Sequence, residues 1–197
     1  MSKPFLIAGT PRSRTAWLAA VCNMVPGALC LHEPVAWCPP WRNAVEMWGV
    51  GGYDYIGISD SGLSFHLAEI IDRWAPQILL VDRIKPEVDE SMLRAFGTPK
   101  SNFCDLLTEA LLPFRHHPLV RSVPFEILGQ PGVVQGLIQH LMPGAAVDLI
   151  KLRVMERLNV QINPGQMLKS VADMAAPTAA DLIGAHAAAR LVLAEEH

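Results

Sequence analysis

The stretch FLIAGTPRSRTAW, residues 5–17, decides the fold of this chain. Its first part, Phe5–Gly9, is a short apolar run bounded by turn-forming residues, which predicts a strand buried on both faces of a parallel sheet. Helical spacing then runs from Thr15 to Met24. A buried strand that passes through a short loop into a helix is the repeating unit of α/β proteins.

The same alternation continues along the chain. Further apolar runs predict strands at Ala28–Leu31, Ile78–Val81 and Val123–Leu128, and helical spacing predicts helices at 64–74, 86–96, 132–141 and 145–158. Residues 37–62 hold three tryptophans and both tyrosines, which indicates a partly irregular segment covering the site or, alternatively, ordinary core packing. We therefore predict an α/β fold of three layers, with a central, mainly parallel sheet flanked by helices and a ligand site at the carboxyl ends of its strands.

Composition limits the kinds of protein this can be. The 197 residues predict one domain, 1–197, with an alanine-rich helical tail from about residue 163. Although 51% of the residues are hydrophobic, no apolar run reaches the roughly 18 to 20 residues of a membrane span. No signal peptide is visible either. We therefore expect a cytoplasmic protein that does not bind membranes.

Charge and cysteine patterns point to a small-molecule partner. The net charge is −3 and the 16 basic residues are spread along the chain, which argues against a nucleic-acid surface. The cysteines form no C-x-x-C pair and have no histidine at zinc-finger spacing, so we expect neither a structural metal nor disulfides. Nothing in the sequence indicates the oligomeric state.

The loop after the first strand has the features of a phosphate cradle. Free backbone N–H groups and the dipole at a helix start favour an anion, and Arg12 adds a fixed positive charge. Ser13 and Thr15 add hydroxyl donors. A Walker A loop would need Gly and Lys where Arg14 and Thr15 stand, which weakens a kinase interpretation. An ordinary strand-to-helix turn is the alternative.

This loop resembles the P-[KR]-S-G-T-T-W loop of the sulfotransferases, as in a small bacterial or phage member of that family. Pro11, Arg12, Ser13, Thr15 and Trp17 agree with the pattern, whereas Arg14 replaces its Gly and Ala16 replaces a Thr. The resemblance implies the P-loop fold of that family and 3′-phosphoadenosine 5′-phosphosulfate (PAPS) as sulfuryl donor and co-substrate, with no metal. The residues it assigns to the donor here are Thr10, Pro11, Arg12, Ser13, Arg14, Thr15, Ala16 and Trp17.

A second segment is similar to the same family. Sulfotransferases carry an Arg at a strand end and a Ser eight residues later, and the resemblance implies that Arg83 and Ser91 grip the 3′-phosphate of the donor. A solvated arginine at a strand end is the alternative for Arg83. The segment Val123–Leu128 has weaker similarity to the family, and its glycine-rich R-G-x-x-G segment has no counterpart here.

Sulfuryl transfer needs a base for the acceptor proton and positive charge at the leaving oxygen. Arg12 suits the second role, because it is permanently charged. Glu33 at the end of the second strand is our candidate base, since some bacterial branches carry an acidic residue followed by Pro there. His32 is the competing candidate for the base. The alternative to both roles is that His32 and Glu33 only cap the strand and pair with a loop arginine such as Arg42.

The sequence thus predicts an enzyme that moves a sulfuryl group from PAPS to a hydroxyl or amine of a small acceptor. Its acceptor cannot be read from the sequence. One competing function is a P-loop phosphotransferase, with Thr15 and Asp82 as Mg²⁺ ligands. Another is a non-catalytic nucleotide-binding protein. The segment Ser59–Gly62 is expected to cap a helix, with acceptor binding as the alternative.

Overall fold

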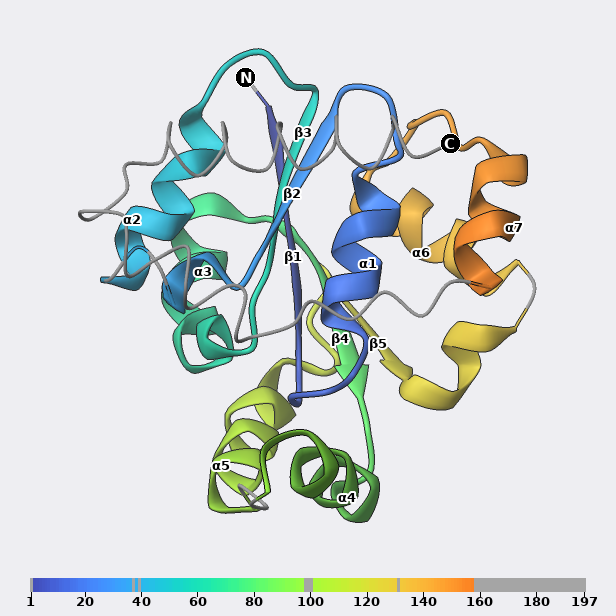
Figure 1. The fold of residues 1–197 in the computed structure, drawn as a ribbon. Helices are drawn as coiled ribbons and strands as arrows, with labels where there is room; N and C mark the ends of the chain where they lie inside the picture. The colour runs from blue at the N-terminus through green and yellow to red at the C-terminus, as the bar shows by residue number, and fades with distance from the viewer. Residues whose placement is uncertain (1, 37, 39, 98–100, 131, 158–197) are drawn as a thin grey trace, which may run out of the picture.

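The computed structural model of the protein describes residues 2–36, 38, 40–97, 101–130 and 132–157. At its centre is a five-stranded sheet in the order β2-β3-β1-β4-β5, in which every neighbouring pair is parallel (Figure 1). The strands are β1 (Lys3–Gly9), β2 (Ala28–His32), β3 (Tyr55–Ser59), β4 (Gln77–Asp82) and β5 (Val120–Pro124). The predicted fold class, a parallel sheet flanked by helices, is confirmed.

Helices cover both faces of this sheet. The α-helices are α1 (Thr15–Cys22), α2 (Trp41–Glu46), α3 (Leu67–Trp74), α4 (Lys85–Phe96), α5 (Ser101–Leu111), α6 (Val133–Leu141) and α7 (Leu149–Arg157). Short 3-10 helices are η1 (Pro34–Ala36), η2 (Met47–Gly49), η3 (Gly62–His66), η4 (Leu112–Phe114) and η5 (Phe125–Gly129). Figure 1 shows α1, α6 and α7 on one face and α2 and α3 on the other, with α4 and α5 beyond the carboxyl ends of the strands.

The central strand β1 is buried on both faces, as its unbroken apolar sequence predicts. Phe5 and Ile7 pack into the cluster under α1 and α6, whereas Leu6 and Ala8 pack into the cluster under α3, because side chains alternate along a strand. Gly57 of the neighbouring β3 makes room for Phe5, since an added Cβ there would overlap the phenyl ring.

Two predicted elements need correction, and one strand was not predicted. Within residues 37–62 the structure has α2, η2 and β3, and the unpredicted β3 lies between β2 and β1. The predicted strand Val123–Leu128 is displaced, since β5 ends at Pro124 and the chain then turns into η5. The last described helix begins at Leu149 and not at 145. The predicted tail from about 163 lies outside the described residues.

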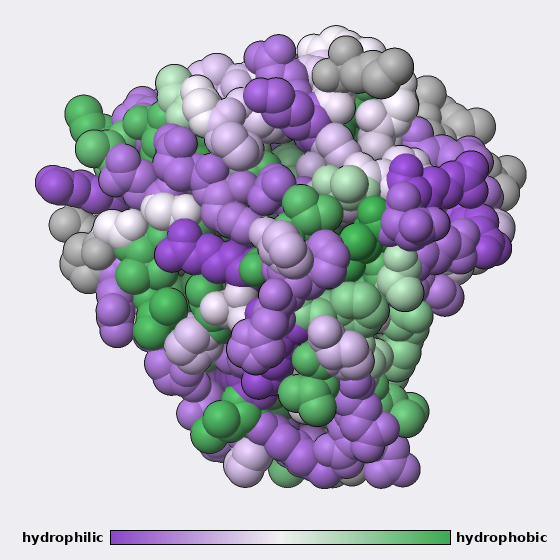
Figure 2. All heavy atoms as spheres, turned by 180° about the vertical axis from the view of Figure 1, so that it is seen from behind, coloured by the Kyte–Doolittle hydropathy of each residue, from purple (hydrophilic) through white to green (hydrophobic). Residues whose placement is uncertain are grey.

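Hydrophobic and hydrophilic side chains are mixed on the surface. Figure 2, seen from behind, shows hydrophobic residues on the lower part of the molecule, around α4 and α5, separated by hydrophilic ones. Exposed apolar side chains there include Leu93, Phe103 and Leu106. Among the helices that the structure describes, none has the length and hydropathy of a membrane-spanning segment.

Candidate functional site

The loop between β1 and α1 has an unusual backbone. Arg12 and Arg14 lie in the left-handed region, with φ of 63° and 58°, which costs a non-glycine residue about 1 to 2 kcal/mol. The buried hydroxyls of Thr10 and Ser13 are hydrogen-bonded to each other at 2.9 Å inside the loop. Arg14, the N-cap residue of α1, makes no side-chain cap to the first helical turn. The amides at this helix start therefore suit an anion.

The two segments that resemble sulfotransferases meet at this loop. Arg12 Nε donates to Ser91 Oγ on α4 at 3.1 Å, although the residues are 79 positions apart. Arg83, which follows β4, donates from Nη1 to the carbonyl of Arg12 at 2.7 Å. Its Nε donates to Glu87 at 3.1 Å. Arg83 is therefore not a solvated arginine, and its side chain is only 14% exposed.

Other predicted donor residues serve the structure of the loop. Trp17 is buried, and its indole N–H donates to the Met155 carbonyl at 2.8 Å, so it joins α1 to α7. Thr15 is also buried, and its carbonyl accepts a hydrogen bond from Ser59 Oγ at 2.9 Å. Pro11 and Ala16 are half-buried on the loop and on α1.

The candidate base Glu33 lies where β2 ends. Its φ is 49°, and its N–H donates to the Ser59 carbonyl of β3 at 2.8 Å. The carboxyl group is partly exposed, and burial of the rest raises its pKa. Arg42 is bonded to Glu69 at 2.8 Å, so the alternative in which it pairs with this strand end is wrong.

His32 differs from Glu33 in burial and charge. The ring is 7% exposed, and burial lowers its pKa to about 4. At neutral pH the ring is therefore uncharged, and Nδ1 carries the hydrogen that it donates to the Ser59 carbonyl at 3.2 Å. Nε2 is then the free base, 3.9 Å from Glu33 Oε1.

Asp60 is a site residue that the sequence analysis did not single out as a base. It is 4% exposed, and its carboxylate accepts the N–H of Val35 at 3.0 Å and of Gly62 at 2.7 Å. The Gly62 contact reaches the first residue of η3, whereas the N-cap residue Ser61 makes no side-chain cap. The Val35 contact ties the end of β3 to the turn after Glu33. Burial, helped by the nearby charge of Glu33, raises the pKa of Asp60 to about 6.

Asp82, the Mg²⁺ ligand of the kinase alternative, is engaged elsewhere. One carboxylate oxygen accepts from Arg115 at 2.8 Å and the other from Ser122 Oγ at 2.9 Å. Within the described ranges there is no group of three or more histidine, cysteine or acidic side chains arranged to hold a metal ion. Both carboxylate oxygens of Asp82 are therefore engaged in contacts within the protein.

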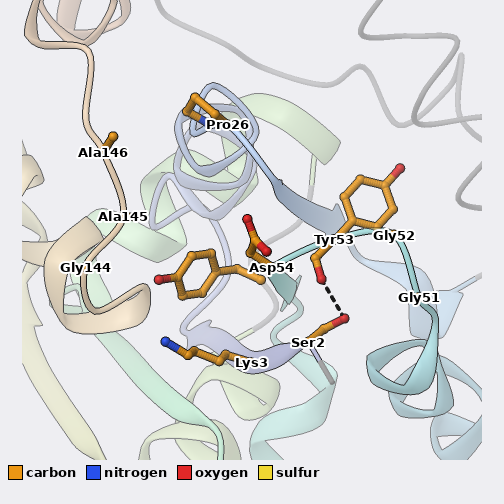
Figure 3. Close-up of a pocket in the computed structure, with 11 residues that line it drawn as sticks. Ser2, Lys3, Pro26, Gly51, Gly52, Tyr53, Asp54, Gly144, Ala145 and Ala146 are labelled. Carbon is orange, nitrogen blue, oxygen red and sulfur yellow. Dashed lines mark hydrogen bonds between the residues drawn. The ribbon is translucent and has the colours of Figure 1, made fainter.

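A pocket of about 520 Å³ lies at the amino ends of the strands, at the other end of the sheet from the loop between β1 and α1 (Figure 3). Lys3 and Tyr55, at the amino ends of β1 and β3, line it together with Asp54. Lys3 Nζ lies 5.3 Å from the Tyr55 ring centroid. Because the phosphate loop follows the carboxyl end of β1, this pocket is separate from the loop.

Comparison with known proteins supports the fold. No model of a known protein family and no curated protein matches the sequence. A sulfotransferase from Alicyclobacillus acidocaldarius is similar in structure, with a TM-score of 0.51 and 14% identity over 86% of this chain and 91% of that chain. A gluconokinase from Sinorhizobium meliloti has a TM-score of 0.45 and 14% identity over 85% of this chain and 97% of that one. At such identity the likeness to the sulfotransferase shows the fold alone and leaves the reaction open.

Proposed function

We propose that the protein is a sulfotransferase that transfers a sulfuryl group from PAPS to a hydroxyl or amine of a small acceptor. The observation that carries the proposal is the hydrogen-bonded cluster of Arg12, Arg83 and Ser91. These residues come from two separate segments that resemble the family, and both meet at the amino end of α1. The start of α1, which has no side-chain cap, and the arginines beside it fit an anionic nucleotide.

The chain's residues would divide the chemistry between them. The acceptor oxygen or nitrogen attacks sulfur, the bond from sulfur to the bridging phosphate oxygen breaks, and the electron pair stays on the phosphate. Arg12 and the amides of the loop stabilise that negative charge. Glu33 accepts the acceptor's proton, helped by the raised pKa of its carboxyl group. Neutral His32, whose unprotonated Nε2 lies 3.9 Å from Glu33 Oε1, is the alternative base.

Ligand preference tests the proposal. Ligands that bind the native state raise the melting temperature according to their affinity. We expect adenosine 3′,5′-bisphosphate, the nucleotide product, to raise the melting temperature more than ATP with Mg²⁺. The reverse preference would favour a phosphotransferase, and no shift with either nucleotide would favour a protein that does not bind nucleotides at this loop.

A further inference from the structure

Phe125 lies beside two arginines of the phosphate loop region. Asp82 and Pro124 are register partners at the ends of β4 and β5, so Arg83 and Phe125 are the residues that directly follow these two adjacent strands. The Arg83 guanidinium lies 4.2 Å from the Phe125 ring centroid, and that of Arg14 lies 5.6 Å from it. Both distances are within the range of about 6 Å in which a ring attracts a cation.

We propose that Phe125 is a positioning residue that holds Arg14 and Arg83 as a pair, and that this pair binds a doubly charged phosphate group. Phe125 is half-buried and packs against the core cluster of α1 and α6, so its ring is a fixed support. Identifying that group as the 3′-phosphate of the donor rests on the proposed function.

The charges around the ring are unbalanced in favour of an anion. Arg83 uses two of its five N–H groups, on the Arg12 carbonyl and on Glu87, which leaves three donors. Arg14 is exposed, and among the described residues no carboxylate lies within ion-pair distance of it. Glu87 offsets the charge of Arg83, so the charge left uncompensated beside the ring is that of Arg14. That charge and the remaining donors of Arg83 both suit a phosphate group.

This arrangement also accounts for the departure of Arg14 from the family pattern. At a φ of 58°, glycine would fit the backbone without strain, whereas arginine costs stability. The arginine side chain gains contact with Phe125 and, at 5.7 Å, with the Trp17 ring. An arginine at this position therefore strains the backbone but places a second cation next to Arg83.

The test uses inorganic pyrophosphate as probe in calorimetric titrations. Arg14→Gly should weaken pyrophosphate binding roughly tenfold, the effect of losing a charge-assisted contact, while the melting temperature stays equal or rises. Phe125→Leu should weaken it severalfold, and Phe125→Tyr should bind like the wild type because the ring is kept. Arg73→Gln, which removes an arginine 4.8 Å from the Trp74 ring on α3, is the control for net charge and should change nothing.

The opposite results overturn the inference. They are unchanged or tighter pyrophosphate binding by Arg14→Gly, equal binding by Phe125→Leu and Phe125→Tyr, or no pyrophosphate binding by the wild type. Adenosine 3′,5′-bisphosphate and ATP with Mg²⁺ are titrated in parallel. If the wild type prefers ATP, the proposed function fails, and the pyrophosphate comparison still decides whether Arg14 and Phe125 act as a pair with Arg83.

Discussion

Replacing Asp60 by asparagine should change how the stability of the protein depends on pH. Burial raises the pKa of Asp60 from its ordinary 3.8 to about 6. Between these values the native protein holds a proton that the unfolded chain has lost, so stability falls as the pH rises. At about 1.4 kcal/mol for each pH unit, the loss from Asp60 reaches about 3 kcal/mol by pH 6.

His32 acts in the opposite direction over almost the same interval. Its pKa is lowered from 6.5 to about 4, so the unfolded chain takes up the proton first and stability falls as the pH drops. As the pH falls from 6.5 to 4, His32 lowers the stability of the wild type by about 3 kcal/mol. Protonation of Asp60 raises the stability by nearly the same amount over this interval, so the two contributions nearly cancel. Asp60→Asn removes one of the two contributions. The variant should therefore lose about 3 kcal/mol more than the wild type between pH 6.5 and pH 4.

Urea unfolding followed by tryptophan fluorescence measures this difference at a series of pH values. The protein has five tryptophans, which supply the signal. Asp72→Asn, an exposed change on α3, is the matched control and should follow the wild type. If the stability difference between wild type and Asp60→Asn is the same at pH 4 and pH 6.5, Asp60 does not titrate in this interval. Burial would then not raise the pKa of Asp60 in the native protein.

Three further predictions concern the site and the sheet. Arg83→Ala should weaken adenosine 3′,5′-bisphosphate far more than adenosine 5′-phosphosulfate, which lacks the 3′ group; equal losses in calorimetry would assign Arg83 a purely structural role. Glu33→Gln should keep nucleotide affinity and lower the single-turnover rate of sulfuryl transfer by about 10²- to 10⁴-fold. His32→Gln should keep most of that rate. The reverse outcome would make His32 the base. Gly57→Ala should lower the unfolding free energy by about 1 to 3 kcal/mol, because its methyl group would overlap Phe5; an unchanged denaturation midpoint would contradict that.

The elements that could be predicted were those with strong local signals. The run Phe5–Gly9 is apolar at every position, because β1 is covered on both faces, and the loop after it has a distinctive residue pattern. By contrast, β3 has a glycine at its centre, which is atypical of strands. Gly57 is there because it makes room for the Phe5 ring. The place of β3 between β2 and β1 depends on long-range pairing that no local pattern reports.

The site was predicted to the extent that its residues belong to sequence motifs. Arg12, Arg83 and Ser91 were found by their motifs, and the structure brings them together. The position of Asp60 at a strand end could not be recognised without β3. Phe125 was missed because its contact with Arg83 depends on β5 ending next to β4. Such information is contained in the sheet register and not in the neighbouring residues.

The central position of β1 also has a consequence for synthesis of the chain. Its two partners are β3 and β4, which end at Ser59 and Asp82. At the usual rates of translation, the residues between Gly9 and Asp82 take roughly 4 to 15 s to be made. The strand that carries the phosphate loop therefore leaves the ribosome long before either neighbour can pair with it. Its apolar segment therefore stays without its strand partners during that interval.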